Sequence, residues 1–200
     1  MNLLERLDAL DRQAFLALNA LNSPALDDLM WSVSRLELWV PLYVFFLFML
    51  QRRWGWRALA IAVPVIALLL FGTDTGSVVL FKNSVQRLRP SHVPELQDRI
   101  HLLLSPDGGL YRGGTFGFVS SHASNHFGIA AFMIGVLRGS QRWAAPALLF
   151  WAAFVSYSRI YLGVHYPGDI LVGGLYGFIV GSIAFAIFRR MNDHFAVVRP

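Results

Sequence analysis

The sequence contains no cysteine, which excludes disulfides, thiolate nucleophiles and cysteine-based metal sites. Charged residues are scarce as well: they make up 14% of the 200 residues, whereas a soluble domain carries about a quarter. Hydrophobic residues reach 56%, the mean hydropathy is +0.51, and the apolar residues gather in long runs. These features predict an integral membrane protein of the all-α class, a polytopic bundle of membrane helices.

Several other signals are missing. The sequence shows no internal repeat, low-complexity tract or linker, so we expect a single domain over residues 1–200. Five charged residues within the first twelve exclude the apolar core of a signal peptide. No acidic or histidine cluster has the spacing of metal ligands, and we expect no metal or other cofactor. The net charge is +5, but the basic residues border the apolar runs and do not cluster on one face of a helix. This distribution argues against a nucleic acid partner.

The apolar runs predict about five transmembrane helices, each near the ~20 residues that cross a hydrocarbon core. Pro64 is expected to kink the second of them. Residues 1–22 place leucines at helical spacing with the charged residues off that stripe, which predicts an amphipathic helix. This helix either lies at the membrane interface or packs on the rest of the protein. The predicted spans cover residues 26–50, 57–81, 121–137, 143–161 and 169–188.

Arginine-rich segments follow three of the predicted spans: QRRWGWR after the first, RGSQR after the third, and the tail from Arg189 after the fifth. Five spans place all three segments on one side, and the positive-inside rule makes that side cytoplasmic. Residues 82–120 and the turn around His165 then lie on the outer side. Residues 82–120 also hold five basic residues, which weakens the difference in basic charge between the two sides.

Three polar clusters fall at the same membrane depth on the predicted outer face. KNSVQRLRP (82–90) follows the second span, FVSSHASNH (118–126) opens the third, and SRIYLGVHYPGD (158–169) joins the last two. Taken singly, the basic residues of the first cluster could be interfacial anchors, and the histidines of the second could be packing residues. Ionisable groups at membrane depth are costly, so their convergence at one depth favours a functional site.

Together these residues suit phosphoryl transfer. Arginine and lysine can clamp the oxygens of a phosphate dianion, and backbone N–H groups at a helix start near Ser120 and Ser121 can add to the clamp. One histidine can attack phosphorus while a second protonates the departing oxygen. Asp169 can hold the attacking histidine in the required tautomer. Pro167 is expected to break the helix between His165 and Asp169, so a turn must bring these two together.

The first cluster has the form K-x6-R-P, and the third has the form S-R-x5-H-x3-D. With a histidine motif between them, the sequence resembles the type 2 phosphatidic acid phosphatase (PAP2) superfamily. That superfamily includes membrane lipid phosphatases, bacterial acid phosphatases and vanadium haloperoxidases. The order and spacing agree across residues 82–169, and the predicted spans extend the resemblance to most of the chain. A haloperoxidase fits the motifs but not the spans, since known relatives of that type are soluble.

The resemblance implies a role for each candidate residue and implies no metal. His165 would be the nucleophile that forms a phosphohistidine, Asp169 would orient it, and His122 would be the acid that protonates the leaving group. The residues expected to bind the phosphate are Lys82, Arg89, Ser120, Ser121 and Arg159.

Two features depart from the family's pattern or lie outside it. The middle motif of the family is usually P-S-G-H, whereas this chain reads VSSH with Ser121 in the place of glycine. Serine retains its N–H donor, so we expect activity to survive. Asp74 lies inside the second predicted span, and we expect it to hydrogen-bond between helices, with support of Lys82 as the alternative.

The resemblance implies a membrane lipid phosphatase acting on the extracytoplasmic face of a bacterial inner membrane. Its partners would be the bilayer and a lipid phosphate: undecaprenyl diphosphate first, lipid A phosphate next, then phosphatidylglycerol phosphate or phosphatidic acid. A lipid-to-lipid phosphotransferase with the same site stays open, because an acceptor site need not contain distinctive residues. A transporter or scramblase would spread charges through the membrane, often with internal repeats, and the sequence shows neither.

Overall fold

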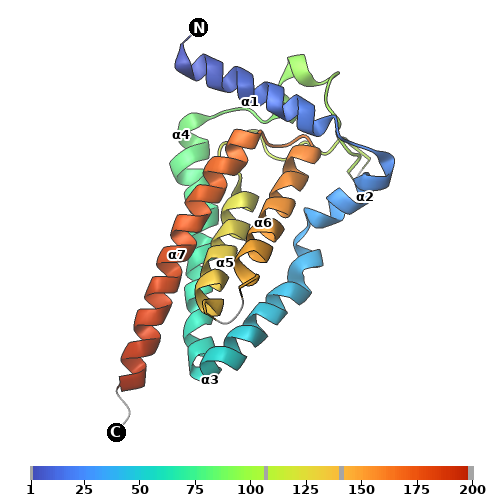
Figure 1. Cartoon of the computed structure of the whole chain (residues 1–200). Coiled ribbons are helices and arrows are strands. Elements are labelled where there is room, and N and C mark those ends of the chain that lie inside the picture. Colours follow the sequence, from blue (N-terminus) through green and yellow to red (C-terminus); the bar gives the residue numbers. More distant parts are fainter. Residues whose placement is uncertain (1, 106–107, 140–141, 198–200) are drawn as a thin grey trace.

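The chain folds into a bundle of helices (Figure 1). The computed structural model describes residues 2–105, 108–139 and 142–197, and within these ranges it contains no strand beyond two isolated β-bridges. A π-helix and two 3-10 turns lie between the α-helices. In chain order the elements are α1 (Leu3–Asn19), α2 (Pro24–Val33), α3 (Leu36–Gly76), the π-helix η1 (Ser77–Lys82), α4 (Asn83–Val85), η2 (Pro90–His92), η3 (Pro94–Leu96), α5 (Ser121–Leu137), α6 (Ala144–Tyr161) and α7 (Pro167–Val197).

Helix α5 packs against α3, α6 and α7, and its closest partner is α7. Three glycines recur every four residues on α7, at Gly173, Gly177 and Gly181. A Cβ at Gly177 would collide with the Ser124 carbonyl, and one at Gly181 would collide with the Gly128 carbonyl. Small residues at this spacing let helix backbones approach closely in membrane proteins. The two helices run in the same direction, so this seam brings their N-termini together (Figure 1).

Helix α3 is a pair of limbs joined at a sharp bend (Figure 1). Pro41 and Pro64 lie within the limbs, yet the residue of α3 with non-helical backbone angles is Gly55, at φ 85° and ψ 173°. A positive φ suits glycine because it has no Cβ. The limbs correspond to the first two predicted spans, and Gly55 lies in the segment QRRWGWR that was predicted to connect them. Pro64, which was expected to kink the second span, keeps helical backbone angles.

The first predicted span begins later than expected. The prediction runs unbroken from residue 26, whereas α2 ends at Val33 and α3 begins at Leu36. The backbone of Arg35 is extended between them, and the Trp39 indole donates a hydrogen bond to the Val33 carbonyl at 2.8 Å. That bond satisfies one of the carbonyls that a helix end leaves unpaired. Helix α2 is therefore a separate short element.

The three arginine-rich segments lie together at the end of the bundle that holds Gly55 (Figure 1). Arg53 donates to the Arg138 carbonyl at 2.6 Å, and Arg57 donates to the Phe195 carbonyl at 2.7 Å. Residues 140–141 of RGSQR lie outside the described residues. The shared position agrees with the expectation that these segments occupy one side.

Among the described residues, two stretches of helix are long and apolar enough to cross a membrane, Leu36–Val85 and Pro167–Phe195. Their apolar 18-residue windows have mean hydropathies of 2.0 and 2.2, respectively. Helices α5 and α6 are shorter, at 17 and 18 residues. Large apolar side chains on α3 and α7 face outward, among them Leu68, which is 70% exposed, and Leu171, which is 73% exposed. Such a surface suits contact with lipid.

Helix α1 lies across the opposite end of the bundle (Figure 1). A capping box formed by Asn2 and Glu5 starts it. The predicted leucine stripe is exposed, since Leu7 is 53% and Leu10 is 61% accessible, while Phe15 on another face is buried. The amphipathic helix expected over residues 1–22 therefore forms over residues 3–19. Its first two turns expose leucines such as Leu7 and Leu10, whereas Leu16 and Leu18 pack against the protein.

Candidate active site

A cavity of about 400 Å³ opens at the α1 end of the bundle. Its walls come from the junction of α2 and α3, the ends of α3 and η1, the segment between α4 and α5, the first two turns of α5, the last turn of α6 and the turn before α7. The three polar clusters, which are far apart in the sequence, thus meet around one space. Six of the predicted site residues line it: Lys82, Arg89, Ser121, His122, Arg159 and His165.

The turn between α6 and α7 holds a histidine–aspartate pair. His165 lies in this turn, Pro167 starts α7, and Asp169 lies in its first turn. The His165 Nδ1 atom is 3.2 Å from Asp169 Oδ2, and Arg89 Nη1 donates to His165 Nε2 at 2.9 Å. Because the carboxylate only accepts and the guanidinium only donates, both contacts require the tautomer with the proton on Nδ1. The expected turn forms, and it leaves the Nε2 lone pair directed toward Arg89.

Asp169 is itself held in place from several sides. Its Oδ2 atom accepts a hydrogen bond from the Tyr166 backbone at 3.0 Å, and its Oδ1 atom accepts one from Arg87 at 3.2 Å. The Ser120 N–H donates to the Asp169 carbonyl at 3.0 Å. The side chain is fully buried, and it lies behind His165 without lining the cavity. It can therefore orient His165 without touching a ligand in the cavity.

Three cations face the cavity. Lys82 donates to the Ser121 hydroxyl at 2.6 Å, and Arg159, which is only 3% exposed, donates to the Tyr111 hydroxyl at 2.7 Å. The Arg159 Nε atom has no hydrogen-bond partner among the residues that the structure describes. Burial and the nearby charge of Arg159 lower the pKa of Arg89 to about 10. None of these three cations forms an ion pair with a carboxylate of the described residues, so a phosphate dianion could pair with them directly.

The two serines differ in their position. Ser120 is fully buried, and its hydroxyl accepts the Ala123 N–H at 3.4 Å as the N-cap of α5. Its side chain does not line the cavity, whereas Ser121 does. The Ser121 hydroxyl, at the position where the family usually has glycine, contacts both Lys82 and Ser77 at 2.6 Å. This serine helps to position Lys82.

His122 lies in the first turn of α5 and lines the cavity, as expected for an acid near the leaving group. His126 follows one turn later, with the two rings stacked at 6.3 Å between centroids. His126 Nδ1 is 2.8 Å from the His122 carbonyl, and the Tyr43 hydroxyl is 3.2 Å from its Nε2. The carbonyl requires the proton on Nδ1, so Tyr43 donates to Nε2.

Arg87, which the sequence suggested only as a possible interfacial anchor, joins α1 to the site. Arg87 pairs with Asp11 at 2.6 Å, with Asp8 at 2.8 Å and with Asp169 at 3.2 Å. Its guanidinium also lies 3.8 Å from the centroid of the Tyr166 ring. Asp11 accepts a hydrogen bond from the Gly168 N–H at 2.7 Å, next to Asp169 in the chain. Helix α1 thus fixes the start of α7.

We expect Asp11→Asn to lower kcat about tenfold with little change in KM, because outer contacts that orient a catalytic group typically matter by about that factor. Asp8→Asn is the matched control: Asp8 is 41% exposed and does not contact Gly168, so its effect should stay below about threefold. Steady-state kinetics of both variants in detergent measure this. Equal effects of the two substitutions would contradict the proposed role of Asp11.

Burial and the charges of Arg89, Arg159 and Lys82 hold the pKa of His165 well below its usual value of 6.5. A histidine with a lowered pKa stays neutral as the pH falls through 6.5. The acid limb of kcat/KM that belongs to His165 should therefore lie below pH 6.5. The measurement is the pH dependence of kcat/KM for two substrates whose phosphate groups have different pKa values. A limb caused by ionisation of the substrate would shift between the two substrates, whereas a limb caused by His165 would not. An acid limb near 6.5 that both substrates share would contradict the expectation.

Asp74 was expected to hydrogen-bond between helices, and this expectation is wrong. Its carboxylate makes no hydrogen bond or ion pair with any described residue, because it faces the cavities and not a neighbouring helix. Its charge does attract Lys82.

The described part of the chain holds no group of three or more histidine, cysteine, aspartate or glutamate side chains that could bind a metal ion.

The PAP2 superfamily model matches residues 64–193. The lipid A 4'-phosphatase of Bacteroides thetaiotaomicron is 35% identical over 192 residues, which cover 95% of this chain and 82% of that protein. The crystal structure of Aquifex aeolicus LpxE matches with a TM-score of 0.60 and 26% identity, covering 88% of this chain and 95% of that one.

A second solved structure shares the fold. The transmembrane PAP2-type phosphatidylglycerolphosphate phosphatase of Bacillus subtilis matches with a TM-score of 0.62 and 20% identity, over 97% of this chain and 90% of that one. The likeness extends along nearly the whole all-helical membrane bundle. Together with the family match and the relative from Bacteroides, it leads to one conclusion: the chain belongs to the PAP2 superfamily and is a membrane phosphatase of the PAP2 type.

Proposed function

We propose that this protein removes a phosphate from lipid A or a closely related acylated sugar phosphate, through a phosphohistidine on His165. The observation that carries the mechanism is the contact of Arg89 with His165 Nε2 at 2.9 Å. A phosphate oxygen bound by Arg89 brings phosphorus next to the nitrogen that holds the lone pair. Lys82 and Arg159 line the same cavity and can bind the other phosphate oxygens.

The reaction takes two displacements at phosphorus. In the first, His165 Nε2 forms a bond to phosphorus, the bond to the lipid oxygen breaks, and His122 gives that oxygen a proton. Asp169 stabilises the positive charge that develops on the His165 ring. In the second, water attacks phosphorus, the N–P bond breaks, and a water proton returns to His122. Inorganic phosphate leaves and both histidines regain their starting states.

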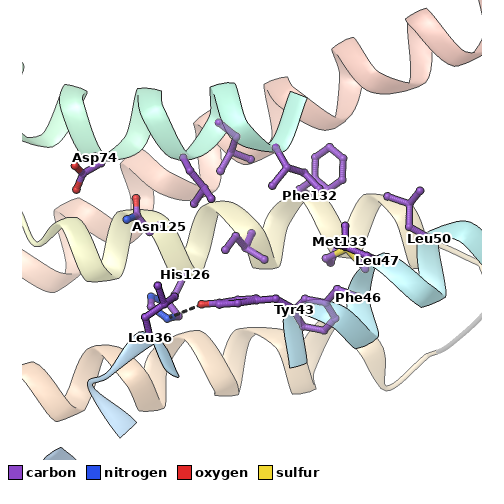
Figure 2. A pocket seen from close by; sticks show the side chains of 14 residues that line it. Leu36, Tyr43, Phe46, Leu47, Leu50, Asp74, Asn125, His126, Phe132 and Met133 are labelled. Carbon is purple, nitrogen blue, oxygen red and sulfur yellow. Dashed lines mark hydrogen bonds between the residues drawn. The ribbon is translucent and has the colours of Figure 1, made fainter. Parts of the chain in front are cut away.

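A second cavity supports a lipid substrate. It has a volume of about 410 Å³ and lies between the limbs of α3 and α5 (Figure 2). Its wall is mainly apolar, with side chains such as Phe46, Leu50 and Phe132. It shares Leu36 and three polar residues with the polar cavity. The acyl chains of a lipid whose phosphate is bound near His165 could occupy this space.

The arrangement of charges supports the membrane orientation. The arginine-rich segments gather at the Gly55 end, which the positive-inside rule assigns to the cytoplasm. The cavity at the α1 end then faces the periplasm or exterior, and the exposed leucines of α1 lie at the interface. In this orientation the two limbs of α3 and helices α5, α6 and α7 supply the five spans. The site meets its lipid at the outer surface of the inner membrane.

Phosphate release by the purified protein tests the proposal. The substrates are lipid A, undecaprenyl diphosphate, phosphatidylglycerol phosphate and phosphatidic acid, each in detergent with a chelator present. The similarity to lipid A 4'-phosphatases leads us to expect the highest kcat/KM with lipid A, which differs from the ranking suggested by the sequence. Preference for undecaprenyl diphosphate would contradict the substrate assignment. Loss of lipid phosphate without release of inorganic phosphate would indicate transfer to another lipid.

A further inference from the structure

Three polar residues stand where the two cavities meet. Asp74 at the end of α3, and Asn125 and His126 on α5, line both the polar and the apolar cavity. We call these three residues the collar. In Figure 2 their side chains lie at one end of the apolar cavity, with the apolar side chains beyond them. A lipid whose phosphate reaches His165 and whose chain fills the apolar cavity would pass the collar.

The collar has hydrogen-bonding capacity that the protein does not use. The Asp74 carboxylate has no hydrogen-bond partner among the described residues. Asn125 accepts a hydrogen bond from Thr73 at 2.6 Å through Oδ1, and its Nδ2 has no partner within the described ranges. His126, in contrast, uses both ring nitrogens, with Tyr43 and with the His122 carbonyl. The free groups are one carboxylate and one amide NH2.

These groups do not suit the phosphate itself. A carboxylate repels a phosphate dianion, and it accepts hydrogen bonds but donates none. It does suit the donors of a neutral group, such as a hydroxyl or an amide N–H. The Asn125 NH2 suits a carbonyl or hydroxyl oxygen. Asp74 is exposed in the structure, so its carboxylate is open to a ligand, and ionisable side chains at membrane depth are candidates for function.

We propose that Asp74 and Asn125 form a subsite for the hydroxyl or amide groups of an acylated sugar, between its phosphate and its acyl chains. The proposal rests on the proposed function and deepens it. An isoprenoid diphosphate has no such groups, because its hydrocarbon chain begins at the phosphate oxygen. The collar therefore selects the sugar lipid over the isoprenoid.

The test compares kcat/KM for lipid A and for undecaprenyl diphosphate in the wild type, Asp74→Ala, Asp74→Asn and Asn125→Ala. Loss of a hydrogen bond to a charged group should reduce the preference for lipid A about 10- to 100-fold in Asp74→Ala. We expect a smaller reduction, of about tenfold or less, in Asn125→Ala. Asp74→Asn keeps the size and shape of the side chain and removes its charge, so it replaces Asp74→Ala in the test if the alanine variant fails to fold. Asp193→Asn, at the far end of α7, is the control.

The ratio of the two kcat/KM values separates this subsite from a supporting role through Lys82. Loss of support for Lys82 would lower both substrates equally, since both need the phosphate site. An unchanged ratio of the two kcat/KM values in a folded and active Asp74 variant would therefore contradict the proposed subsite and leave the proposed function intact. A wild type that hydrolyses neither lipid would overturn the proposed function and the collar together.

Discussion

Replacing His165 by alanine should lower phosphate release at least about 10⁴-fold, because the nucleophile is lost and the remaining groups can only bind the phosphate. The residue is buried, and its Nε2 atom faces Arg89 at the wall of the cavity. A change confined to binding would raise KM and leave kcat near the wild-type value. We expect the reverse: a lower kcat with a KM of similar size.

His194→Ala is the matched control for this prediction. His194 lies on α7 at the Gly55 end of the bundle, far along the chain from the cavity, and its side chain is exposed. The control should keep wild-type kinetics. Size-exclusion chromatography in detergent checks that both variants stay folded. A folded His165→Ala protein that keeps more than about a tenth of the wild-type kcat would contradict the assignment of His165 as the nucleophile.

Asp169→Asn should lower kcat about 10³- to 10⁴-fold although it changes only one atom of the side chain. The carboxylate requires a proton on His165 Nδ1, 3.2 Å away. An asparagine can instead present its NH2 to Nδ1, which stabilises the tautomer with the proton on Nε2. The lone pair then points away from the phosphate site. The lost negative charge also removes stabilisation of the phosphorylated ring.

Asp98→Asn is the control for Asp169→Asn, because Asp98 is an exposed carboxylate in the segment after η3. We expect it to behave as wild type. Equal kcat values in Asp169→Asn and the wild type would contradict the tautomer argument. An intermediate effect that follows a loss of thermal stability would indicate that Asp169 acts mainly through folding, since it also bonds to Tyr166 and Ser120.

The sequence predicted the parts of the site that depend on residue type and order. Three polar clusters at one membrane depth predicted a common site, and Lys82, Arg159 and His165 do line one cavity. The turn between His165 and Asp169 followed from the proline between them. The helix class and the shared side of the arginine-rich segments followed from the apolar runs.

Features that depend on local backbone geometry were harder to predict. The break between α2 and α3 has no proline or glycine, and it is stabilised by Trp39, six residues from the carbonyl that it caps. The segment QRRWGWR was expected to connect two separate spans, whereas the helix continues through it on both sides of the single non-helical residue Gly55. Ser120 and Ser121 are adjacent, and only the start of α5 decides which hydroxyl faces the cavity.

Contacts between distant segments left no signal in a single sequence. Arg87 is 76 residues from Asp11, and Asp8 and Asp11 look like the polar face of an amphipathic helix. Nothing in their spacing indicates that they face an arginine beside the site. The same holds for Asp74, whose neighbours across the cavity lie on α5. The positions of such residues beside the site become apparent only in the three-dimensional structure.

Trapping the phosphorylated enzyme tests the central claim most directly. His122→Ala should be used beside the wild type with a radiolabelled aryl phosphate, whose leaving group needs no acid, so that the first step proceeds while the second is slow. The account predicts an acid-labile, alkali-stable label on the protein, which is absent when His165 is also replaced by alanine. Turnover without any trapped label, or a label that persists without His165, would contradict the account.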